Sequence, residues 1–121
     1  MIKKRVLIVD DEEGYRKVLS NSLADLGYET KAVNNGFEAL EEIKRRSYSI
    51  ILLDVQMPGM DGIEAAQAIT QDHPIPIILL TAYSEQELAE RAANANVAAY
   101  LMKPISEHDL LPAIALAMSR F

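Results

Sequence analysis

The fold of this chain is indicated by one stretch, Ile50-Ile51-Leu52-Leu53-Asp54-Val55-Gln56-Met57-Pro58-Gly59-Met60-Asp61-Gly62. Four apolar residues lead directly into an aspartate, and proline and glycine then interrupt regular structure. Such a run is typical of a strand buried on both faces. A buried strand holds a carboxylate more easily at its carboxyl end than in its middle, because an unpaired buried charge is costly. Ligands of open parallel sheets bind at that end. Asp54 is therefore placed to meet a metal ion or a phosphate, although opening a turn is also an ordinary role for aspartate.

Composition and charge narrow the possible functions. With 121 residues, 50% of them hydrophobic and 25% charged, the chain predicts one globular domain over residues 1–121. The net charge of −6 argues against nucleic-acid binding, which needs a basic surface. The lack of cysteine excludes disulfides, thiolate catalysis and thiolate zinc sites. No apolar run is long enough to span a bilayer or to act as a signal peptide, so we expect a cytoplasmic protein with no membrane contact.

Short apolar runs alternate with amphipathic segments along the whole chain. Five strands are predicted, at residues 5–10, 28–33, 49–54, 75–81 and 98–103. The second is less apolar than the others, which is typical of a sheet edge. A helix is predicted after each strand. Five alternating strands and helices predict an α/β fold with a parallel sheet covered by helices on both faces.

The spacing of apolar residues predicts which face of each helix is buried. For the first helix, which ends at Gly27, this face consists of Tyr15, Val18, Leu19, Ser22, Leu23 and Leu26. The next two helices are marked by Phe37, Leu40 and Ile43, and by Ile63, Ala66 and Ile69. The fifth helix, which Ser106 caps, should bury Leu110, Ile114, Met118 and Phe121. Pro112 should bend it slightly.

The fourth helix is expected to pack loosely. Ser84 and Glu87 have the spacing of a capping box at its start. Beyond that start the segment is rich in alanine, and Leu88 is its only large apolar residue.

Polar residues stand at the carboxyl ends of four predicted strands. These residues are Asp10 and Asp11, Asp54, Thr81 and Lys103. Parallel strands end at one edge of the sheet, so the five side chains should lie together. Carboxylates without histidine or cysteine favour a hard ion, Mg²⁺ or Mn²⁺, and Thr81 and Lys103 are suitable donors to a phosphoryl group. This edge therefore predicts a metal and phosphoryl site with a carboxylate available as the nucleophile.

Each of these residues also has an ordinary structural explanation. Asp11 suits the cap of the first helix, Thr81 suits any strand, and Lys103 with Pro104 suits an exposed turn. Their coincidence at one edge of the sheet favours the functional interpretation.

The sequence resembles the receiver domains of two-component response regulators over essentially its whole length. The matching motifs are Leu7-Ile8-Val9-Asp10-Asp11-Glu12, Asp54 with Met57-Pro58-Gly59-Met60-Asp61-Gly62, Leu80-Thr81-Ala82, and Tyr100-Leu101-Met102-Lys103-Pro104. The resemblance implies a flavodoxin-like, doubly wound, five-stranded parallel sheet in the order 2-1-3-4-5, with five helices.

The same resemblance implies a role for each site residue. Asp54 would accept a phosphoryl group from a phosphohistidine of a sensor histidine kinase or phosphotransfer protein. Mg²⁺ would be held by Asp11, Asp54 and the backbone carbonyl of Gln56, with Asp10 acting largely through water.

Three further residues complete the implied machinery. Lys103 would bind the phosphoryl group, and the peptide bond between Lys103 and Pro104 would be cis. Thr81 would reach toward the phosphoryl group and Tyr100 would turn inward. The face formed by the fourth helix, fifth strand and fifth helix would then signal output and support a phosphorylation-dependent homodimer.

A finer resemblance links the chain to receivers joined to an RNA-binding antitermination domain, the ANTAR class. It is carried by Thr81-Ala82-Tyr83-Ser84, Glu87-Leu88-Ala89-Glu90-Arg91-Ala92, Asp109-Leu110-Leu111-Pro112-Ala113-Ile114 and Ser119-Arg120-Phe121. No such output domain is present in the sequence, so no RNA contact is assigned to this domain. Asn94-Ala95-Asn96 departs from the glycine common in receivers.

Three other functional classes are consistent with parts of the pattern. A haloacid-dehalogenase-like phosphatase would use Asp54 as nucleophile, but it requires a second aspartate at the position of Gln56. A flavodoxin would need a loop rich in Ser, Thr and Gly where the chain has Asp10-Asp11-Glu12-Glu13. A pseudo-receiver that only docks partners has no need of a complete set of site residues.

Overall fold

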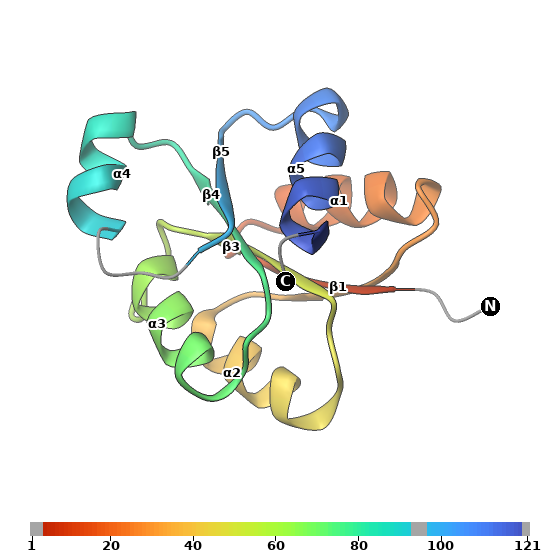
Figure 1. Cartoon of the computed structure of the whole chain (residues 1–121), viewed down its shortest axis with the longest axis horizontal. Coiled ribbons are helices and arrows are strands. Elements are labelled where there is room, and N and C mark those ends of the chain that lie inside the picture. The colour runs from red at the N-terminus through yellow and green to blue at the C-terminus, as the bar shows by residue number, and fades with distance from the viewer. Residues whose placement is uncertain (1–3, 93–96, 120–121) are drawn as a thin grey trace.

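The computed structural model describes residues 4–92 and 97–119 (Figure 1). Strands and helices alternate in the order β1 (Arg5–Val9), α1 (Glu13–Asp25), β2 (Glu29–Val33), α2 (Gly36–Arg45), β3 (Ile50–Asp54), α3 (Gly62–Asp72), β4 (Ile77–Thr81), α4 (Glu85–Ala92), β5 (Ala99–Met102) and α5 (Glu107–Ser119). The predicted departure at 94–96 and the predicted burial of Phe121 fall outside the described residues.

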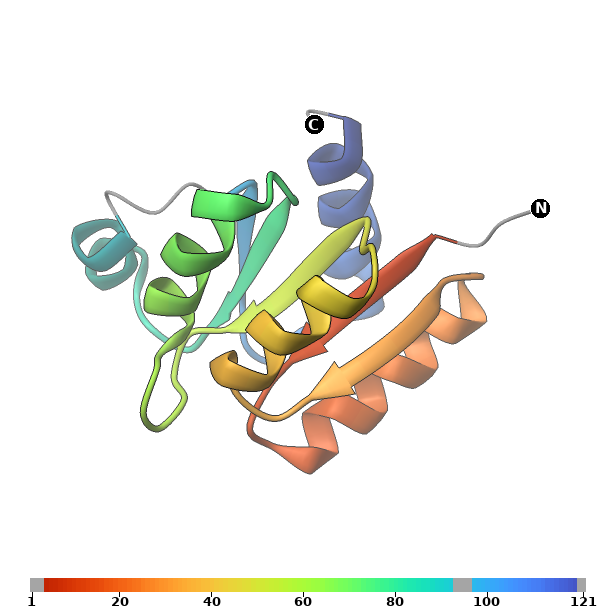
Figure 2. The ribbon, with the colours of Figure 1, turned by 90° about the horizontal axis from the view of Figure 1, so that it is seen from below.

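The strands form one parallel sheet in the order β2-β1-β3-β4-β5. This confirms the predicted fold class, strand order and edge position of β2. The strands point the same way, so their carboxyl ends share one edge (Figure 2). β4 starts two residues later than predicted, after both prolines, because proline cannot donate to a strand ladder.

Two apolar cores lie on opposite faces of the sheet, because successive strand side chains point to opposite sides. Leu7, Ile51 and Leu53 face a core closed by α2, α3 and Leu88 of α4. Ile8, Ile50 and Leu52 face a second core closed by α1 and α5 (Figures 1 and 2). Every residue of β3 is buried, as a strand covered on both faces requires.

The predicted buried face of α1 was partly wrong. Leu19 and Leu23 are buried and Tyr15 is half-buried, but Val18 is 59% exposed. At about 100° per residue, Val18 lies well round the helix from the line through Leu19 and Leu23. Leu26, the C-cap residue of α1, is also exposed, although its backbone is still helical and its N–H bonds the Ser22 and Leu23 carbonyls.

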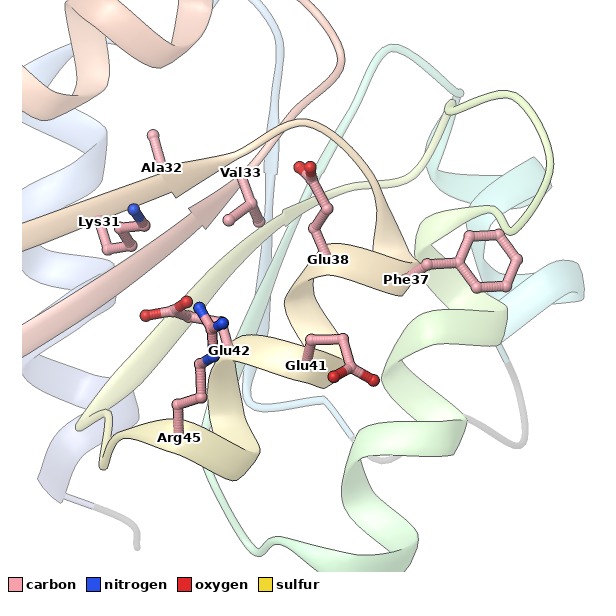
Figure 3. A pocket seen from close by; sticks show the side chains of 8 residues that line it. All are labelled: Lys31, Ala32, Val33, Phe37, Glu38, Glu41, Glu42 and Arg45. Carbon is pink, nitrogen blue, oxygen red and sulfur yellow. The ribbon is translucent and has the colours of Figure 1, made fainter.

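The prediction for α2 failed in a similar way. Phe37 is 59% exposed, whereas Ala39, Glu42 and Ile43 are buried. Phe37 lies in the first turn of the helix and points away from the other side chains drawn in Figure 3.

The predicted buried residues of α3, α4 and α5 agree with the structure where it describes them. Ile63, Ala66 and Ile69 of α3 are buried, as are Leu110 and Ile114 of α5, and Met118 packs partly buried beside them. Leu88 is the buried anchor of α4. Its capping is one-sided in the bonds described: the Ser84 hydroxyl accepts from the Glu87 backbone N–H at 3.2 Å. No helix in the described part of the chain has both the length and the apolarity needed to cross a membrane.

A buried carboxylate on α2 replaces the apolar residue that periodicity would place there. Glu42 is 6% exposed and accepts a hydrogen bond from the Tyr48 hydroxyl at 2.6 Å. This bond lowers the pKa of Glu42, and burial raises the pKa of Tyr48. Glu42 also lines a surface hollow of about 440 Å³ between β2 and α2 (Figure 3). The hydrogen bond explains why a charged residue is tolerated there.

We predict that Tyr48→Phe lowers the free energy of unfolding by about 1–2 kcal/mol at pH 7, because Glu42 keeps its charge and loses its donor. Chemical denaturation measures the change. Tyr28→Phe, at a half-buried tyrosine of the other core, is the control. Equal stability of the Tyr48→Phe variant and the parent would show that water replaces the hydroxyl at no cost.

Candidate functional site

The edge of the sheet at the carboxyl ends of the strands brings the predicted polar residues into one place. Asp10 directly follows β1, Asp54 ends β3, Thr81 ends β4, and Lys103 directly follows β5. Backbone hydrogen bonds align these ends: the Lys103 N–H donates to the Thr81 carbonyl at 2.7 Å, and the Val55 N–H donates to the Leu80 carbonyl at 2.9 Å. The site is therefore positioned by the ladder of the sheet itself.

One half-buried ammonium faces several carboxylates at this edge. Lys103 Nζ lies 3.1 Å from Asp54 Oδ1, 3.3 Å from Asp10 Oδ2 and 3.7 Å from Glu12 Oε1. Asp10 and Asp54 are almost fully buried, while Glu12 is exposed. Negative charge exceeds positive charge here, so the arrangement favours the arrival of a further cation.

The pKa values of the buried acids reflect this imbalance. Burial, helped by the charge of Asp10, raises the pKa of Asp54 to about 6, although Lys103 and a Gln56 backbone hydrogen bond lower it. Burial also raises the pKa of Asp10 against the opposing effects of the Glu12 backbone N–H and Lys103. Burial alone would lower the pKa of Lys103, but Asp54 and Asp10 reverse the shift and raise it.

Asp10 is fixed by the start of α1. Its Oδ1 accepts the Glu12 backbone N–H at 2.9 Å, and its carbonyl accepts from Arg16 at 2.8 Å. The N-cap of α1 is Glu12, with no side-chain capping bond. The alternative explanation of Asp11 as a helix cap therefore does not apply, and its exposed carboxylate is free of that role.

The acidic residues suit a hard divalent ion. Carboxylate oxygens of Asp10, Asp11 and Glu12 lie within 4.8 Å of one another. Among the residues described, Asp54 Oδ1 is buried without a well-aligned hydrogen bond, despite the nearby Lys103 ammonium. A buried oxygen in this state and an all-oxygen donor set fit Mg²⁺ or Mn²⁺. The exposed residue Gln56 lies two positions after Asp54, the last residue of β3.

Gly62 lets the next helix start against the end of β3. A side chain at this glycine would place its Cβ 2.1 Å from the Asp54 carbonyl oxygen, and the Gly62 N–H donates to the Val55 carbonyl at 2.9 Å. Asp61 and Glu64 close a capping box at the same point, with bonds of 2.9 and 3.2 Å. Glycine is needed at position 62 because two backbone segments approach closely there. The sequence pattern had indicated only that Gly62 interrupts regular structure.

The two residues assigned to a switch are in different environments. Thr81 is fully buried, and its hydroxyl accepts the Tyr83 backbone N–H at 2.9 Å. Tyr100, on β5, is 42% exposed. The peptide bond between Lys103 and Pro104 is cis.

The sequence did not reveal the contacts that four further residues make at this edge. Glu12 joins the ion pairs of Lys103, and Arg16 holds the Asp10 carbonyl. The ring of Tyr15 lies 4.3 Å from Lys103 Nζ. Arg91 of α4 bonds both Asp61 and the Tyr83 hydroxyl. Tyr15 and Arg16 follow Glu12 by three and four residues, just after Asp10, and this helical spacing could have indicated that they lie near the site. Nothing in the sequence around Arg91 indicated its distant partner Asp61.

A five-stranded parallel sheet in the order β2-β1-β3-β4-β5, with paired acids after β1, an aspartate ending β3 and a lysine after β5, is the arrangement of a receiver-type α/β fold. The family model described as the response regulator receiver domain matches residues 6–115. The chain belongs to the response regulator receiver family.

Relatives and solved structures agree with this assignment. The transcriptional regulatory protein PdtaR of Mycobacterium tuberculosis is 44% identical over 121 residues, covering 99% of this chain and 59% of PdtaR. The chain thus spans little more than half the length of this relative.

Two solved structures resemble the fold closely. The CheY-like receiver domain protein of Methanospirillum hungatei superposes with a TM-score of 0.91 at 30% identity, covering 98% of this chain and 96% of that one. Chemotaxis protein CheY4 of Vibrio cholerae gives 0.89 at 30% identity, covering 94% and 98%.

The raised pKa of Asp54 predicts a pH-dependent stability in metal-free buffer. Its ordinary pKa is 3.8 and its folded pKa is about 6, so the folded state favours the protonated acid. Protonated Asp54 therefore contributes to the free energy of unfolding. This stabilising contribution is fully present below pH 3.8 and is lost as the pH rises through 6. Asp54→Asn, which mimics the neutral acid, should therefore be more stable than the parent by roughly 1–3 kcal/mol at pH 7.5.

The measurement is denaturant unfolding across pH with EDTA present. The advantage of Asp54→Asn should shrink toward zero as the pH falls below 4. Asp25→Asn, at an exposed acid of α1, should show little effect throughout. An Asp54→Asn difference that is constant with pH would contradict the assignment.

Proposed function

We propose that this receiver domain accepts a phosphoryl group on Asp54 and uses it to change the surface formed by α4, β5 and α5. The observation that carries this proposal is the environment of Asp54. Its carboxylate is 1% exposed at a strand end, with the Lys103 ammonium 3.1 Å from Oδ1 and Asp10 beside it. A buried nucleophile next to one cation and a metal-compatible acid cluster suits phosphoryl transfer, which depends mainly on positioning and charge neutralisation.

The donor in this proposal is the phosphohistidine of a sensor histidine kinase or phosphotransfer protein. An Asp54 oxygen forms a bond to phosphorus as the phosphorus–nitrogen bond breaks, and the imidazole leaves with the electron pair and takes a proton from water. Lys103 Nζ, already paired with Asp54, stabilises the negative charge on the transferring oxygens. Hydrolysis of the acyl phosphate later restores the carboxylate.

Asp11, Asp54 and the Gln56 carbonyl would hold Mg²⁺ or Mn²⁺, with Asp10 acting largely through water. The bound ion supplies charge neutralisation among the carboxylates and the phosphoryl oxygens. The burial of Asp10 and the exposure of Asp11 support this division of roles.

The proposed switch joins Thr81 to Tyr100. A phosphoryl group on Asp54 presents new acceptor oxygens one strand away from the Thr81 hydroxyl, which in this structure is bonded to Tyr83. When the hydroxyl moves to the phosphoryl group it vacates space beneath α4, and Tyr100 turns in from its exposed position to fill it. The surface formed by α4, β5 and α5 then changes shape, and partner proteins bind it differently.

The proposal also covers a longer protein that would contain this domain. The extra length of PdtaR supports a longer regulator in which the domain controls an output segment of ANTAR type. A phosphorylation-dependent homodimer through the α4–β5–α5 surface, the absence of direct nucleic-acid and membrane contacts, and a cytoplasmic location remain predictions.

The first test of the proposal is chemical. With acetyl phosphate and Mg²⁺, the protein should gain the mass of one phosphoryl group, and hydroxylamine should remove it. Asp54→Asn should gain none, because an amide is not a nucleophile for this reaction. Asp72→Asn, at an exposed acid of α3, is the matched control and should be labelled like the parent.

Other outcomes identify the alternatives. EDTA or Asp11→Ala should strongly slow labelling if the acid cluster holds the ion. A docking module would show no mass gain under any condition, and a phosphatase would release inorganic phosphate over many turnovers. Normal labelling of Asp54→Asn would exclude Asp54 as the acceptor.

The switch gives a second prediction. Beryllofluoride, a mimic of the phosphoryl group, should shift amide resonances near Asp54 and also those of α4 and β5. In Thr81→Ala the shifts around Asp54 should remain while those of α4 and Tyr100 shrink, because the coupling hydroxyl is gone.

The matched control is Thr70→Ala, on α3, where the threonine hydroxyl donates to the Ala66 and Gln67 carbonyls of its own helix. It should retain the parent pattern. If Thr81→Ala keeps the full distant shifts, the signal reaches α4 by another route.

A further inference from the structure

The site lysine is in contact with an aromatic ring that has no role in the proposed chemistry. Lys103 Nζ lies 4.3 Å from the centre of the Tyr15 ring. Tyr15 stands in the first turns of α1, and Lys103 follows β5, so the contact joins segments remote in sequence. An ammonium at this distance is attracted by the negative face of the ring.

The ring completes an enclosure around the ammonium. Carboxylates of Asp10, Asp54 and Glu12 lie 3.1–3.7 Å from Nζ. The Lys103 side chain is only 12% exposed, which makes the attraction stronger than at an open surface. Its long flexible stem would otherwise let the ammonium follow Glu12, whose side chain is 62% exposed, toward water.

A purely structural role for Tyr15 would not need an aromatic face. Tyr15 packs half-buried against the core between the sheet, α1 and α5, and Tyr28 packs against the same core. An aliphatic side chain can supply such contact area. Tyr28 is therefore a suitable control for Tyr15, because both tyrosines pack against this core and, of the two, Tyr15 is the one in contact with the Lys103 ammonium.

We propose that Tyr15 is a positioning residue that holds the Lys103 ammonium over Asp54. This inference rests on the proposed phosphoryl transfer to Asp54. The ring attracts the ammonium without offering a full negative charge, so it does not compete with an incoming phosphoryl group as a carboxylate would. Lys103 can then pass from the Asp54 carboxylate to the phosphoryl oxygens while one of its contacts persists.

The experiment compares Tyr15→Phe, Tyr15→Leu and Tyr28→Leu with the parent. Phenylalanine keeps the ring face, leucine keeps only apolar contact, and the Tyr28 variant makes the same substitution in the same core. The first measurement is the chemical shift of the Lys103 ε-methylene protons, which a ring above them moves upfield. The second is the initial rate of phosphorylation by acetyl phosphate with Mg²⁺. Thermal unfolding checks that each variant folds, and Tyr15→Met replaces Tyr15→Leu if leucine prevents folding.

We expect Tyr15→Leu to lose the upfield shift and to be phosphorylated about three- to tenfold more slowly, the range of a partly desolvated cation–π contact. Tyr15→Phe should keep the shift and a rate within about twofold of the parent. Tyr28→Leu should match the parent in both measurements.

Two results would overturn the inference. One is a Lys103 shift that is the same in Tyr15→Leu and the parent, which would mean that the contact is absent in solution. The other is a preserved shift in Tyr15→Phe with a rate as low as that of Tyr15→Leu, which would assign the effect to the hydroxyl. If the parent itself is not phosphorylated, the proposed function fails and this inference fails with it, whereas normal labelling of both the parent and Tyr15→Leu rejects the inference alone.

Discussion

Lys103 reaches the buried carboxylates of Asp10 and Asp54 from the far side of β4, and the site depends on this ion pair. Each acid alone would be costly inside the sheet edge, since burial is the largest cause of both raised pKa values. The positive charge of Lys103 offsets part of the free-energy cost of burying the two carboxylates. One ammonium cannot neutralise both acids, so a net negative charge remains. The same excess that destabilises the free domain makes the site receptive to a divalent ion.

The sheet makes this arrangement possible by its strand order. β1 and β3 are neighbours, which places Asp10 beside Asp54, while β4 separates β3 from β5. The lysine must therefore cross the end of β4, where the chain has the small residue Thr81. This path requires a long side chain after β5, which Lys103 provides, and a small side chain at the end of β4, which Thr81 provides. The strand order thus fixes where both residues lie relative to Asp54.

Strand ends were predictable from the sequence, but helix faces were less so. The apolar runs located all five strands, and the rule that parallel strands end at one edge brought together Asp10, Asp54 and Lys103. Val18 and Phe37 were misplaced because several faces of a short helix can satisfy the same apolar spacing. Tyr15 and Arg91 were missed for a different reason, since their partners lie far along the chain and depend on how each helix is rotated against the sheet.

The weak attachment of α4 is consistent with a small energy driving the proposed switch. Its buried anchor is Leu88, and burying one such side chain contributes roughly 1.5–3 kcal/mol. Arg91 adds bonds to Asp61 and Tyr83, but an ion pair this exposed adds little stability. A hydrogen bond from Thr81 to a charged phosphoryl oxygen is worth about 1.5–3 kcal/mol. The two quantities are comparable, so in the proposed switch one new bond at the strand end would be enough to shift the preferred position of this helix, whereas it would not displace α3 with its several buried residues.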